Sequence, residues 1–592
     1  MIGHGDVTEN IRSRQIASLK QVLNLNQPVN VSMAVEPVWK LLILDKYGQE
    51  IISPIIRVKQ LRELGITLHL LIDAKREPLP DVPAIYFVAP LDANIQIICD
   101  DLKKAMYDSY YLNMIYPISR PNLEELAASA VQGGTTQQVQ KLTDQYLSFI
   151  SLEDDLFMLR KYTEDSPFSF FAINDPMTDA SKMDNLVNLV ANGLFAVCVT
   201  LGVVPIIKCS RNNAAEQVAQ KLDQKIRDNL RDARNNLFTQ ENVRAGQLNL
   251  HRPVLVIADR SIDLSTMLHH TWTYQALISD VLNMQLNRVR MTDKNDKRKE
   301  QSFPLVAEAI EDSLDAYRKN EEEIKRLKKT MGMQNPEDEA VVFALDDATA
   351  RLSSAVGNLP ELLEQKRLID LHTSIATTLL ENIKERKLDV LFEAEEKLLN
   401  GQSIPISESL QLCVNNDDAL RLILITLCSR PLTTKERKDI LTFMEEKGID
   451  PSAYHFVQKL KALSNMTNHP SEEFSFRDGR VKNLVPKKHN LPITKMVDEL
   501  IDTRTGVSGT LTSSGTETDE FRYFDPKLLQ NSLKDPIRAR AGQLAMDVIV
   551  FVVGGGNYVE YQNVHEYGKS KGIQRITYGC TEMANPRNLW IS

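Results

Sequence analysis

The sequence predicts a protein of the α/β plus α class, in which two α/β domains with parallel sheets accompany a large, mainly helical insertion domain. Three observations support this prediction. Short apolar runs alternate with helical patterns in the first part of the chain, and the same alternation returns after residue 158. It resumes near residue 520, after a long helical stretch. A chain of 592 residues is also too long for one hydrophobic core.

The first domain is expected to cover residues 1–157. Trp39–Asp45, Leu68–Ala74 and Ala84–Pro90 are short apolar runs with the length of buried strands. Between the first two, Val58–Gly65 has a helical pattern and ends on a glycine, the residue that most often follows a helix. Strands that alternate with helices in this way form a parallel sheet covered on both faces.

The second domain is expected to cover residues 158–270 and 520–592. Its first part holds Asn185–Ile207, an uncharged run long enough to cross a bilayer. Three Asn, two Gly and a Pro in this run favour a buried helix followed by a strand, so we expect no transmembrane segment. The apolar strand that ends at Asp259 finds its continuation only at Asp547–Gly556, which indicates one domain divided by an insertion.

The insertion, residues 271–519, has a mainly helical pattern. One apolar stripe with a charged reverse face is formed by Ile310, Leu314, Tyr317, Ile324, Leu327 and Met331. Pro360 interrupts a second stretch, and a long helix from Leu362 to about Leu399 follows. The pattern fits a projecting helical hairpin with a hinge at Pro360, and it fits an internal helical bundle equally well. Thr503–Glu520 is rich in Gly, Ser and Thr and is predicted to be a mobile loop.

Composition argues against several classes of function. A net charge of −9 disfavours nucleic acid as the main partner, because phosphate binding needs a basic surface. The six cysteines include no C-x-x-C spacing, which gives neither a disulfide framework nor a zinc site. The N-terminal stretch MIGHGDVTENIRSRQ lacks the apolar segment of a secretory signal. We therefore expect a cytoplasmic protein without a metal or cofactor.

A glycine turn is the first of two stretches that could still carry chemistry. In VVGGGNYVE, Gly554 and Gly556 match the start of a dinucleotide-binding fingerprint, but Val559 stands where its third glycine is needed. A tight turn between a strand and a helix is the favoured interpretation, because only glycine has the backbone freedom that such a turn requires.

A polar cluster after the strand that ends at Asp259 is the second. Asp259, with Asp263, His269 and His270, could form a metal or catalytic site. However, consecutive histidines do not share a helix face, and no Glu or Cys completes a ligand set at familiar spacing. We favour a structural junction in which Asp263 caps the next helix, Arg260 forms a buried pair with an aspartate, and Asp259, Arg260 and Asp263 hold the crossing into the insertion. The alternative is a nucleotide- or metal-dependent enzyme that uses the Gly554–Gly556 turn and the Asp259/His269 cluster.

Four segments of the chain carry a family resemblance. They are GLFAVCVTLGVVPIIK (Gly193–Lys208), DRSIDLSTMLHHTWTYQALISDVL (Asp259–Leu282), DVIVFVVGGGNYVEYQN (Asp547–Asn563) and ITYGCTEM (Ile576–Met583). They resemble, in the same order, segments of the SM (Sec/Munc-type) proteins, the syntaxin-binding regulators of SNARE-mediated membrane fusion. LPELLEQKRLIDLHTSIATTLLENIKERKLDVLFEAEE and DEFRYFDPK look most like the Sly-type branch, which acts between ER and Golgi. The resemblance covers essentially the whole chain.

The resemblance implies a three-domain arch and a non-enzymatic role. The expected function is to bind a syntaxin of the ER or Golgi, of the syntaxin-five type, together with other SNAREs and the assembled SNARE bundle. Binding is expected to promote SNARE complex assembly and vesicle fusion. Tethering factors are further expected partners, and the protein is expected to be a monomer, peripheral on ER and Golgi membranes through its partners. Membership of the same family with another address, at the endosome, vacuole or plasma membrane, is a further possibility.

The resemblance also implies where the syntaxin N-terminal peptide docks. A phenylalanine of the peptide is expected to enter an apolar pocket on the outside of the first domain. Matching LEELA and VQKLTDQYLSFI to the family places in this pocket Leu123, Leu126, Ala127, Val139, Leu142, Thr143 and Tyr146. Both segments are expected to be helices with one apolar face each. The pattern alone favours packing of these faces inside the domain, whereas the resemblance favours a pocket with Glu124, Glu125 and Asp144 nearby to attract a basic residue.

Overall fold

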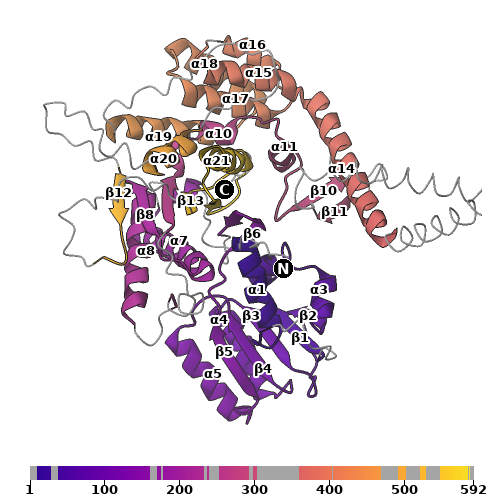
Figure 1. The fold of residues 1–592 in the computed structure, drawn as a ribbon. Coiled ribbons are helices and arrows are strands. Elements are labelled where there is room, and N and C mark those ends of the chain that lie inside the picture. The colour runs from indigo at the N-terminus through magenta and orange to yellow at the C-terminus, as the bar shows by residue number, and fades with distance from the viewer. Residues whose placement is uncertain are drawn as a thin grey trace, which may run out of the picture. The chain divides into compact units, whose positions relative to one another are not determined.

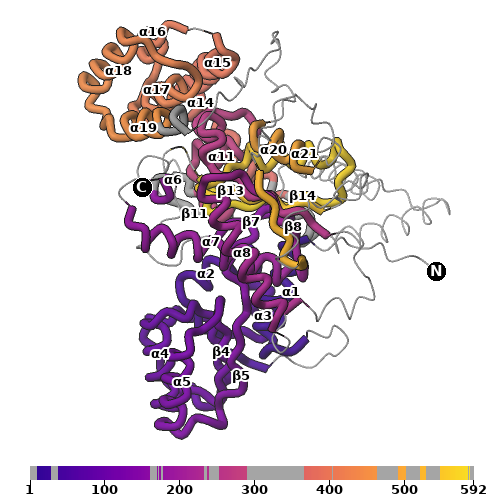
Figure 2. The backbone as a smooth tube through the Cα atoms, turned by 90° about the vertical axis from the view of Figure 1, so that its left-hand side faces the viewer, coloured from indigo at the N-terminus to yellow at the C-terminus, as the bar shows by residue number. Residues whose placement is uncertain are grey.

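The computed structural model describes residues 10–28, 38–159, 170–174, 178–232, 237–238, 252–292, 298–302, 359–402, 404–467, 491–501, 521–528, 547–584 and 586. The chain divides into two compact units. One, which we call the sheet unit, consists of Met1–Leu268 and Pro486–Ser592, and the other, the helical unit, consists of His269–Val485. Figure 1 labels the elements of both units, and Figure 2 follows the same backbone from a second side.

The sheet unit begins with a parallel sheet in which the described strands have the order β2-β1-β3-β4-β5. The strands are β1 (Lys40–Leu44), β2 (Ile66–Leu71), β3 (Ala84–Val88), β4 (Tyr110–Met114) and β5 (Val139–Asp144). The helices between them are α2 (Lys46–Ile52), α3 (Val58–Glu63), α4 (Asp92–Lys103) and α5 (Arg120–Gln132). The three strands and the helix predicted over residues 39–90 are confirmed to within a few residues. Every residue of β1 and β3 is buried, as expected for central strands of a covered parallel sheet.

A second sheet of the same unit is mixed, and its described strands have the order β12-β8-β9-β13-β14-β7-β6. They are β6 (Ile150–Glu153), β7 (Leu156–Met158), β8 (Ile206–Ser210), β9 (Val254–Asp259), β12 (Phe521–Phe524), β13 (Asp547–Val553) and β14 (Arg575–Cys580). Strand β9 pairs in parallel with β13, although the whole helical unit lies between them in the sequence. Strand β7 pairs with β14, and β6 with β7, so the expected boundary of the first domain at residue 157 is too late.

Helices cover this second sheet. They are α1 (Ile11–Leu23), α6 (Phe170–Asn174), α7 (Ala180–Leu201), α8 (Ala214–Arg231), α20 (Pro492–Ile501) and α21 (Tyr558–Lys571). By length and composition α7 could span a membrane, but 61% of its apolar window is buried, and it packs against α8 and α1. Helix α7 is the buried helix that the sequence predicts ahead of β8. Helix α20 packs on α21 and β9, so the expected end of the insertion at residue 519 is also too late.

The helical unit is confirmed as mainly helical. Its described elements are α11 (Tyr274–Val281), β10 (Arg288–Thr292), β11 (Arg298–Ser302), α14 (Leu359–Arg386), α15 (Leu388–Leu399), α16 (Ile406–Gln411), α17 (Asn416–Ser429), α18 (Thr434–Lys447) and α19 (Ser452–Thr467). The antiparallel pair of β10 and β11 was not predicted. The single helix predicted from Leu362 to Leu399 is wrong, because Lys387 adopts a φ of 53° and separates α14 from α15.

Pro360 lies in the first turn of α14, where its missing N–H removes no helical hydrogen bond. The apolar stripe from Ile310 to Met331 and the loop Thr503–Glu520 lie outside the described residues. A hinge at Pro360 therefore stays a proposal.

A buried charged group of residues, which we call the His270 cluster, lies in the core of the helical unit. The backbone N–H and the ring Nδ1 of His270 each lie 2.8 Å from a carboxylate oxygen of Glu395 in α15. The ring Nε2 is 3.7 Å from Oδ1 of Asp418 in α17. The cluster is completed by the ion pairs Arg386–Asp418 and Arg421–Asp280. It therefore ties α11, α14, α15 and α17 to the segment that enters the unit.

Candidate functional site

Helix α5 is the first element of the predicted peptide site. It begins after Ser119, whose hydroxyl accepts a hydrogen bond from the backbone N–H of Asn122 at 3.3 Å. It ends at Gly133, where an added Cβ would lie 2.2 Å from the backbone oxygen of Leu102. The end of α5 is thus pressed against the end of α4, and only glycine fits this contact. The Ser119 cap and the close contact at Gly133 together fix where α5 begins and ends on the sheet.

Strand β5 follows α5 after a short turn and forms an edge of the first sheet. Because β4, α5 and β5 form a crossover unit, α5 covers the sheet face beside β5, as both views show (Figures 1 and 2). The register shifts by one residue between the pairs Tyr110–Val139 and Tyr111–Lys141. This bulge turns Val139 and Leu142 to the same face of the sheet, toward the core under α5.

Five predicted pocket residues gather where α5 meets β5, and we call this surface the α5–β5 face. Leu126 is almost fully buried in the core of the first sheet. Val139 and Leu142 are half-buried and pack against the same core. Leu123 keeps 42% of its surface exposed, and Ala127, four residues on, is exposed as well. The face therefore presents apolar surface to solvent above a rigid apolar base.

Two other predicted pocket residues do not belong to this face. The sequence was expected to be helical from Val139 to Tyr146, but it forms strand β5. Successive strand residues point to opposite sides, so Thr143, which pairs with Asn113, faces away from Leu142. Tyr146 follows the strand with a φ of 53°, and its ring centroid lies 5.8 Å from that of Phe195 in α7. Both residues are therefore removed from the proposed pocket.

Of the three acidic residues expected near the α5–β5 face, Asp144 lies on β5, whereas Glu125 lies on α5 roughly 160° around the helix axis from Leu123. Glu124 forms an exposed ion pair with Arg120, and Glu125 accepts a hydrogen bond from the side chain of Gln96. Asp144 lies at the end of β5 and accepts a hydrogen bond from the backbone N–H of Ile118 at 3.2 Å. Burial raises the pKa of Asp144. Asp144 therefore suits a ligand that carries a basic group next to its apolar anchor.

The predicted junction at Arg260 has a different partner from the one expected. Arg260 is fully buried and forms a two-pronged ion pair with Glu560 of α21, with N–O distances of 2.6 and 2.9 Å. The expected aspartate partner is therefore wrong. The hydroxyl of Tyr578 in β14 donates a further hydrogen bond to Glu560 at 2.7 Å. Burial lowers and Glu560 raises the pKa of Arg260, and the net shift is upward.

Asp259 and Asp263 make local hydrogen bonds. Asp259 accepts one from the backbone N–H of Ser261 at 2.9 Å and so begins the short 3-10 helix η1 (Arg260–Ile262). Asp263 accepts one from the backbone N–H of Thr266 at 3.1 Å, at the start of α10 (Ser265–Leu268). These bonds order the turn after β9, while the long-range connection is made by Arg260. Glu560 could not be recognised from sequence as its partner, because 300 residues separate the two.

The backbone amides of the glycine turn after β13 form hydrogen bonds within the sheet unit. The backbone N–H groups of Gly554 and Gly555 donate to the hydroxyl of Thr581, at 3.1 and 2.9 Å. The N–H of Gly556 donates to the backbone oxygen of Glu582 at 2.9 Å. A Cβ at Gly556 would lie 2.5 Å from the hydroxyl of Tyr578, which explains the glycine by close packing. Amides that would have to hold a phosphate are thus already engaged.

The histidines of the polar cluster belong to the helical unit, whereas Asp259 belongs to the sheet unit. The ring of His269 lies 5.0 Å from that of Phe392, and His270 binds Glu395. Within the part of the chain that the structure describes, no three His, Cys, Asp or Glu side chains converge in a way that would hold a metal ion.

Comparison with known proteins identifies the family of this chain. The model of the Sec1 family matches residues 40–592. The chain belongs to the Sec1 family. This Sec1-family protein is 43% identical to human "Sec1 family domain-containing protein 1", with 97% of this chain and 96% of the human protein covered. It is 42% identical to the Drosophila melanogaster "Protein sly1 homolog", with 98% and 96% covered.

A solved structure is similar to this Sec1-family protein over nearly its whole length. It is the crystal structure of Sly1p in complex with an N-terminal peptide of Sed5p. The TM-score is 0.74 and the sequence identity 29%, with 98% of this chain and 97% of Sly1p covered. The match includes both units of the chain described above.

Proposed function

We propose that this protein binds the N-terminal peptide of a syntaxin-five-type syntaxin on its α5–β5 face. Other SNAREs and the assembled SNARE bundle bind through the helical unit, and the protein thereby promotes SNARE complex assembly and vesicle fusion in ER–Golgi transport. It acts by binding rather than by catalysis, as a cytoplasmic protein that is peripheral on ER and Golgi membranes through its partners. The observation that carries the proposal is the likeness to Sly1p, which was crystallised with an N-terminal peptide of Sed5p.

The chemistry of the α5–β5 face supports this proposal. An aromatic side chain of the peptide would rest on Leu126, with Leu123 and Leu142 at its sides, and burying such an anchor contributes about 2–3 kcal/mol. The apolar floor is held by the core beneath it, so little conformational entropy is lost when the peptide binds. Asp144 would attract a basic residue beside the anchor and speed the encounter.

The substitution Leu123→Arg tests this face. We expect it to weaken binding of a syntaxin-five-type N-terminal peptide at least ~30-fold, because it removes an apolar wall and places a charge beside the anchor. Leu123 is well exposed, so the fold should tolerate the change better than Leu142→Arg would. Fluorescence anisotropy with a labelled peptide measures the affinity, and circular dichroism confirms the fold.

Ala128→Arg is the matched control. Ala128 is exposed on the same helix, roughly 140° around its axis from Leu123. It introduces the same charge away from the α5–β5 face, and we expect affinity within about twofold of the unsubstituted protein. Equal weakening by both variants, or none by Leu123→Arg, would show that the peptide binds elsewhere.

The membrane address is tested by comparing peptides. An array of N-terminal peptides from syntaxins of the ER, Golgi, endosome, vacuole and plasma membrane should show tightest binding to those of the ER and Golgi. Preference for an endosomal, vacuolar or plasma-membrane peptide would move the protein to that membrane. The enzyme alternative gains no support from the glycine turn, because its amides are engaged within the domain.

A further inference from the structure

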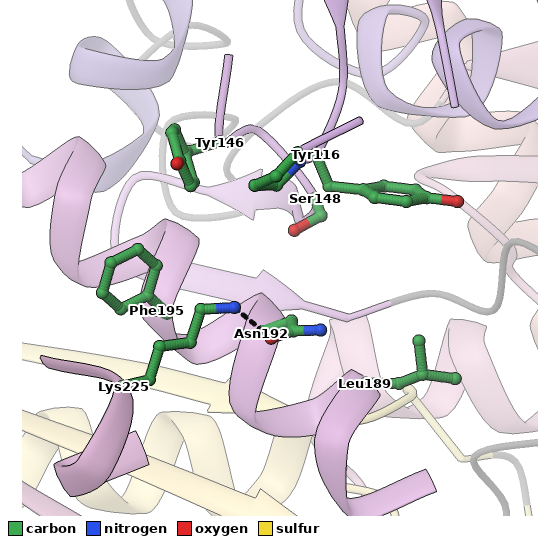
Figure 3. Close-up of a pocket in the computed structure, with 8 residues that line it drawn as sticks. Tyr116, Tyr146, Ser148, Leu189, Asn192, Phe195 and Lys225 are labelled. Atoms are coloured by element: carbon green, nitrogen blue, oxygen red, sulfur yellow. Dashed lines mark hydrogen bonds between the residues drawn. The ribbon is translucent and has the colours of Figure 1, made fainter. Parts of the chain in front are cut away.

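A cavity of about 290 Å³ lies in the sheet unit, apart from the α5–β5 face. Its upper wall comes from the segments that follow β4 and β5, and its lower wall from α7 and α8 (Figure 3). The carboxyl ends of parallel strands are where α/β proteins place ligand sites. The residues that the argument below uses are Tyr116, Tyr146, Leu189, Asn192, Phe195 and Lys225.

The cavity has aromatic walls. The rings of Tyr146 and Phe195 meet edge to face, with centroids 5.8 Å apart and an interplanar angle of 63°. Tyr116 lies across the cavity from α7, and Leu189 lines the far side (Figure 3). An apolar cavity of about 150 Å³ is large enough to bind benzene. The space here accommodates one aromatic ring together with a short polar arm.

Lys225 supplies one positive charge to this apolar space. Its Nζ donates to the side-chain oxygen of Asn192 and lies 5.1 Å from the centroid of the Phe195 ring. Among the residues that the structure describes, no carboxylate pairs with it. Burial lowers the pKa of Lys225, because the charge is removed from water without an acidic partner.

Other lysines of the chain have different sets of partners, although Lys208 also donates to a single neutral oxygen beside an aromatic ring. Lys221, one turn earlier on α8, pairs with Asp184 at 2.7 Å. The buried amine of Lys40 donates to two backbone oxygens, those of Leu23 and Leu64. An ammonium group has three N–H donors, and Lys225 engages one of them with a neutral amide. Among the described residues no acceptor engages the other two donors, so they are available for a ligand in the cavity.

We infer that this cavity binds a carboxylate attached to an aromatic group. The carboxylate accepts hydrogen bonds from Lys225, and the ring packs between Tyr146, Tyr116 and Phe195. A bound anion compensates the lysine charge in a site of low polarity, where a charge-assisted hydrogen bond is stronger than in water. Such a group occurs in a free aryl-alkyl acid and in the C-terminal phenylalanine of a peptide.

The test uses the full chain and two pairs of probes. The first pair is 3-phenylpropionate and its neutral amide, and the second is the tripeptide Gly-Ala-Phe with a free or an amidated C-terminus. In ligand-observed NMR titrations we expect at least one acid to bind and its amide to bind about tenfold more weakly or worse. Binding of both acids assigns the site to a peptide terminus, and binding of the small acid alone assigns it to a free acid. Equal binding of acid and amide, or binding of neither acid, overturns the inference.

Three variants locate the binding. Lys225→Met keeps the apolar stem and removes the charge, and we expect a loss of about tenfold or more. Lys221→Met removes a charge from the same helix outside the cavity and should leave affinity within about twofold. Leu189→Trp fills the space and should abolish binding while Lys225 is retained. Unchanged binding in both Lys225→Met and Leu189→Trp would show that the acid binds elsewhere. The outcome is independent of the peptide site on the α5–β5 face, which these variants leave intact.

Discussion

Arg260→Met is expected to destabilise the second sheet of the sheet unit by about 3–5 kcal/mol. Arg260 and Glu560 are both fully shielded from solvent, and removing the guanidinium leaves a buried carboxylate without a compensating charge. The hydrogen bond from Tyr578 remains, but it cannot replace the charge. Cys580 is buried in β14, the strand that also holds Tyr578, so its rate of thiol labelling, resolved by mass spectrometry, reports opening of this sheet. The rate should rise at least ~100-fold.

Two further variants separate the buried pair from an ordinary ion pair. Arg575→Met breaks the ion pair with Asp547, in which the arginine side chain is 24% exposed and the aspartate side chain 33% exposed. We expect it to lower the free energy of unfolding by about 1 kcal/mol or less. Arg260→Met combined with Glu560→Leu removes both charges and should recover most of the stability, because no uncompensated charge is left. A loss in Arg260→Met no larger than that in Arg575→Met would contradict our interpretation of this pair.

His270→Gln is expected to destabilise the helical unit by about 3–5 kcal/mol near pH 6. The substitution removes the charged ring that binds the fully buried Glu395 and leaves the more distant Arg421 as its compensating charge. The ring centroids of Trp272 and Phe392 lie 5.5 Å apart. In a background with Trp39→Phe and Trp590→Phe, the fluorescence of Trp272 therefore reports on the helical unit. Urea unfolding followed by this signal measures the loss. His455→Gln, at an exposed histidine of α19, is the matched control and should change stability by about 0.5 kcal/mol or less.

The His270 cluster also predicts how the stability of the helical unit depends on pH. Burial and Arg421 lower the pKa of His270, but Glu395 and Asp418 outweigh them, and the net shift is upward from 6.5. The stabilisation by the charged ring is therefore complete below pH 6.5 and is lost as the pH rises through the raised value. The pKa values of Glu395 and Asp418 are lowered despite burial, so their contribution is lost as the pH falls below about 4.

The difference between the unsubstituted protein and His270→Gln should thus be largest near pH 6 and smaller at pH 9. The variant cannot gain or lose a proton at this position, whereas the unsubstituted protein gives up its stabilising charge over this range. A constant difference from pH 6 to pH 9 would mean that His270 is neutral throughout and that the cluster is held by hydrogen bonds alone.

Patterns with a strong local cause were predictable from the sequence. Strands β1, β3, β9 and β13 are nearly continuous apolar runs, because buried parallel strands contact other elements on both faces. The Asn, Gly and Pro content of Asn185–Ile207 predicted the buried helix α7. The divided domain was predicted because the strand patterns that end at Asp259 and begin at Asp547 each lack a partner strand nearby in the sequence. The α5–β5 face was located by family resemblance rather than by pattern.

Features that depend on distant parts of the chain were not predictable. Strand β5 has a polar sequence, VQKLTD, because one side of an edge strand faces solvent, and this pattern looks helical in isolation. The break at Lys387 is set by a backbone conformation that lysine rarely adopts. Tyr146 was assigned to the wrong site because its neighbour, Phe195, lies on a helix of the second sheet. For β5 and Tyr146 the deciding contacts are made by residues remote in sequence.

The position of β13 and β14 in the second sheet has a consequence for biosynthesis. These strands lie between the β8–β9 pair and the β6–β7 pair, yet of the described strands they are the last to leave the ribosome. Until they arrive, β9 and β7 each present an open edge while the entire helical unit is being made. The nascent chain therefore carries two unfinished parts of one sheet while residues 260–546 are being made. Early termination anywhere before β13 would leave them unjoined, exposed to aggregation and dependent on chaperones.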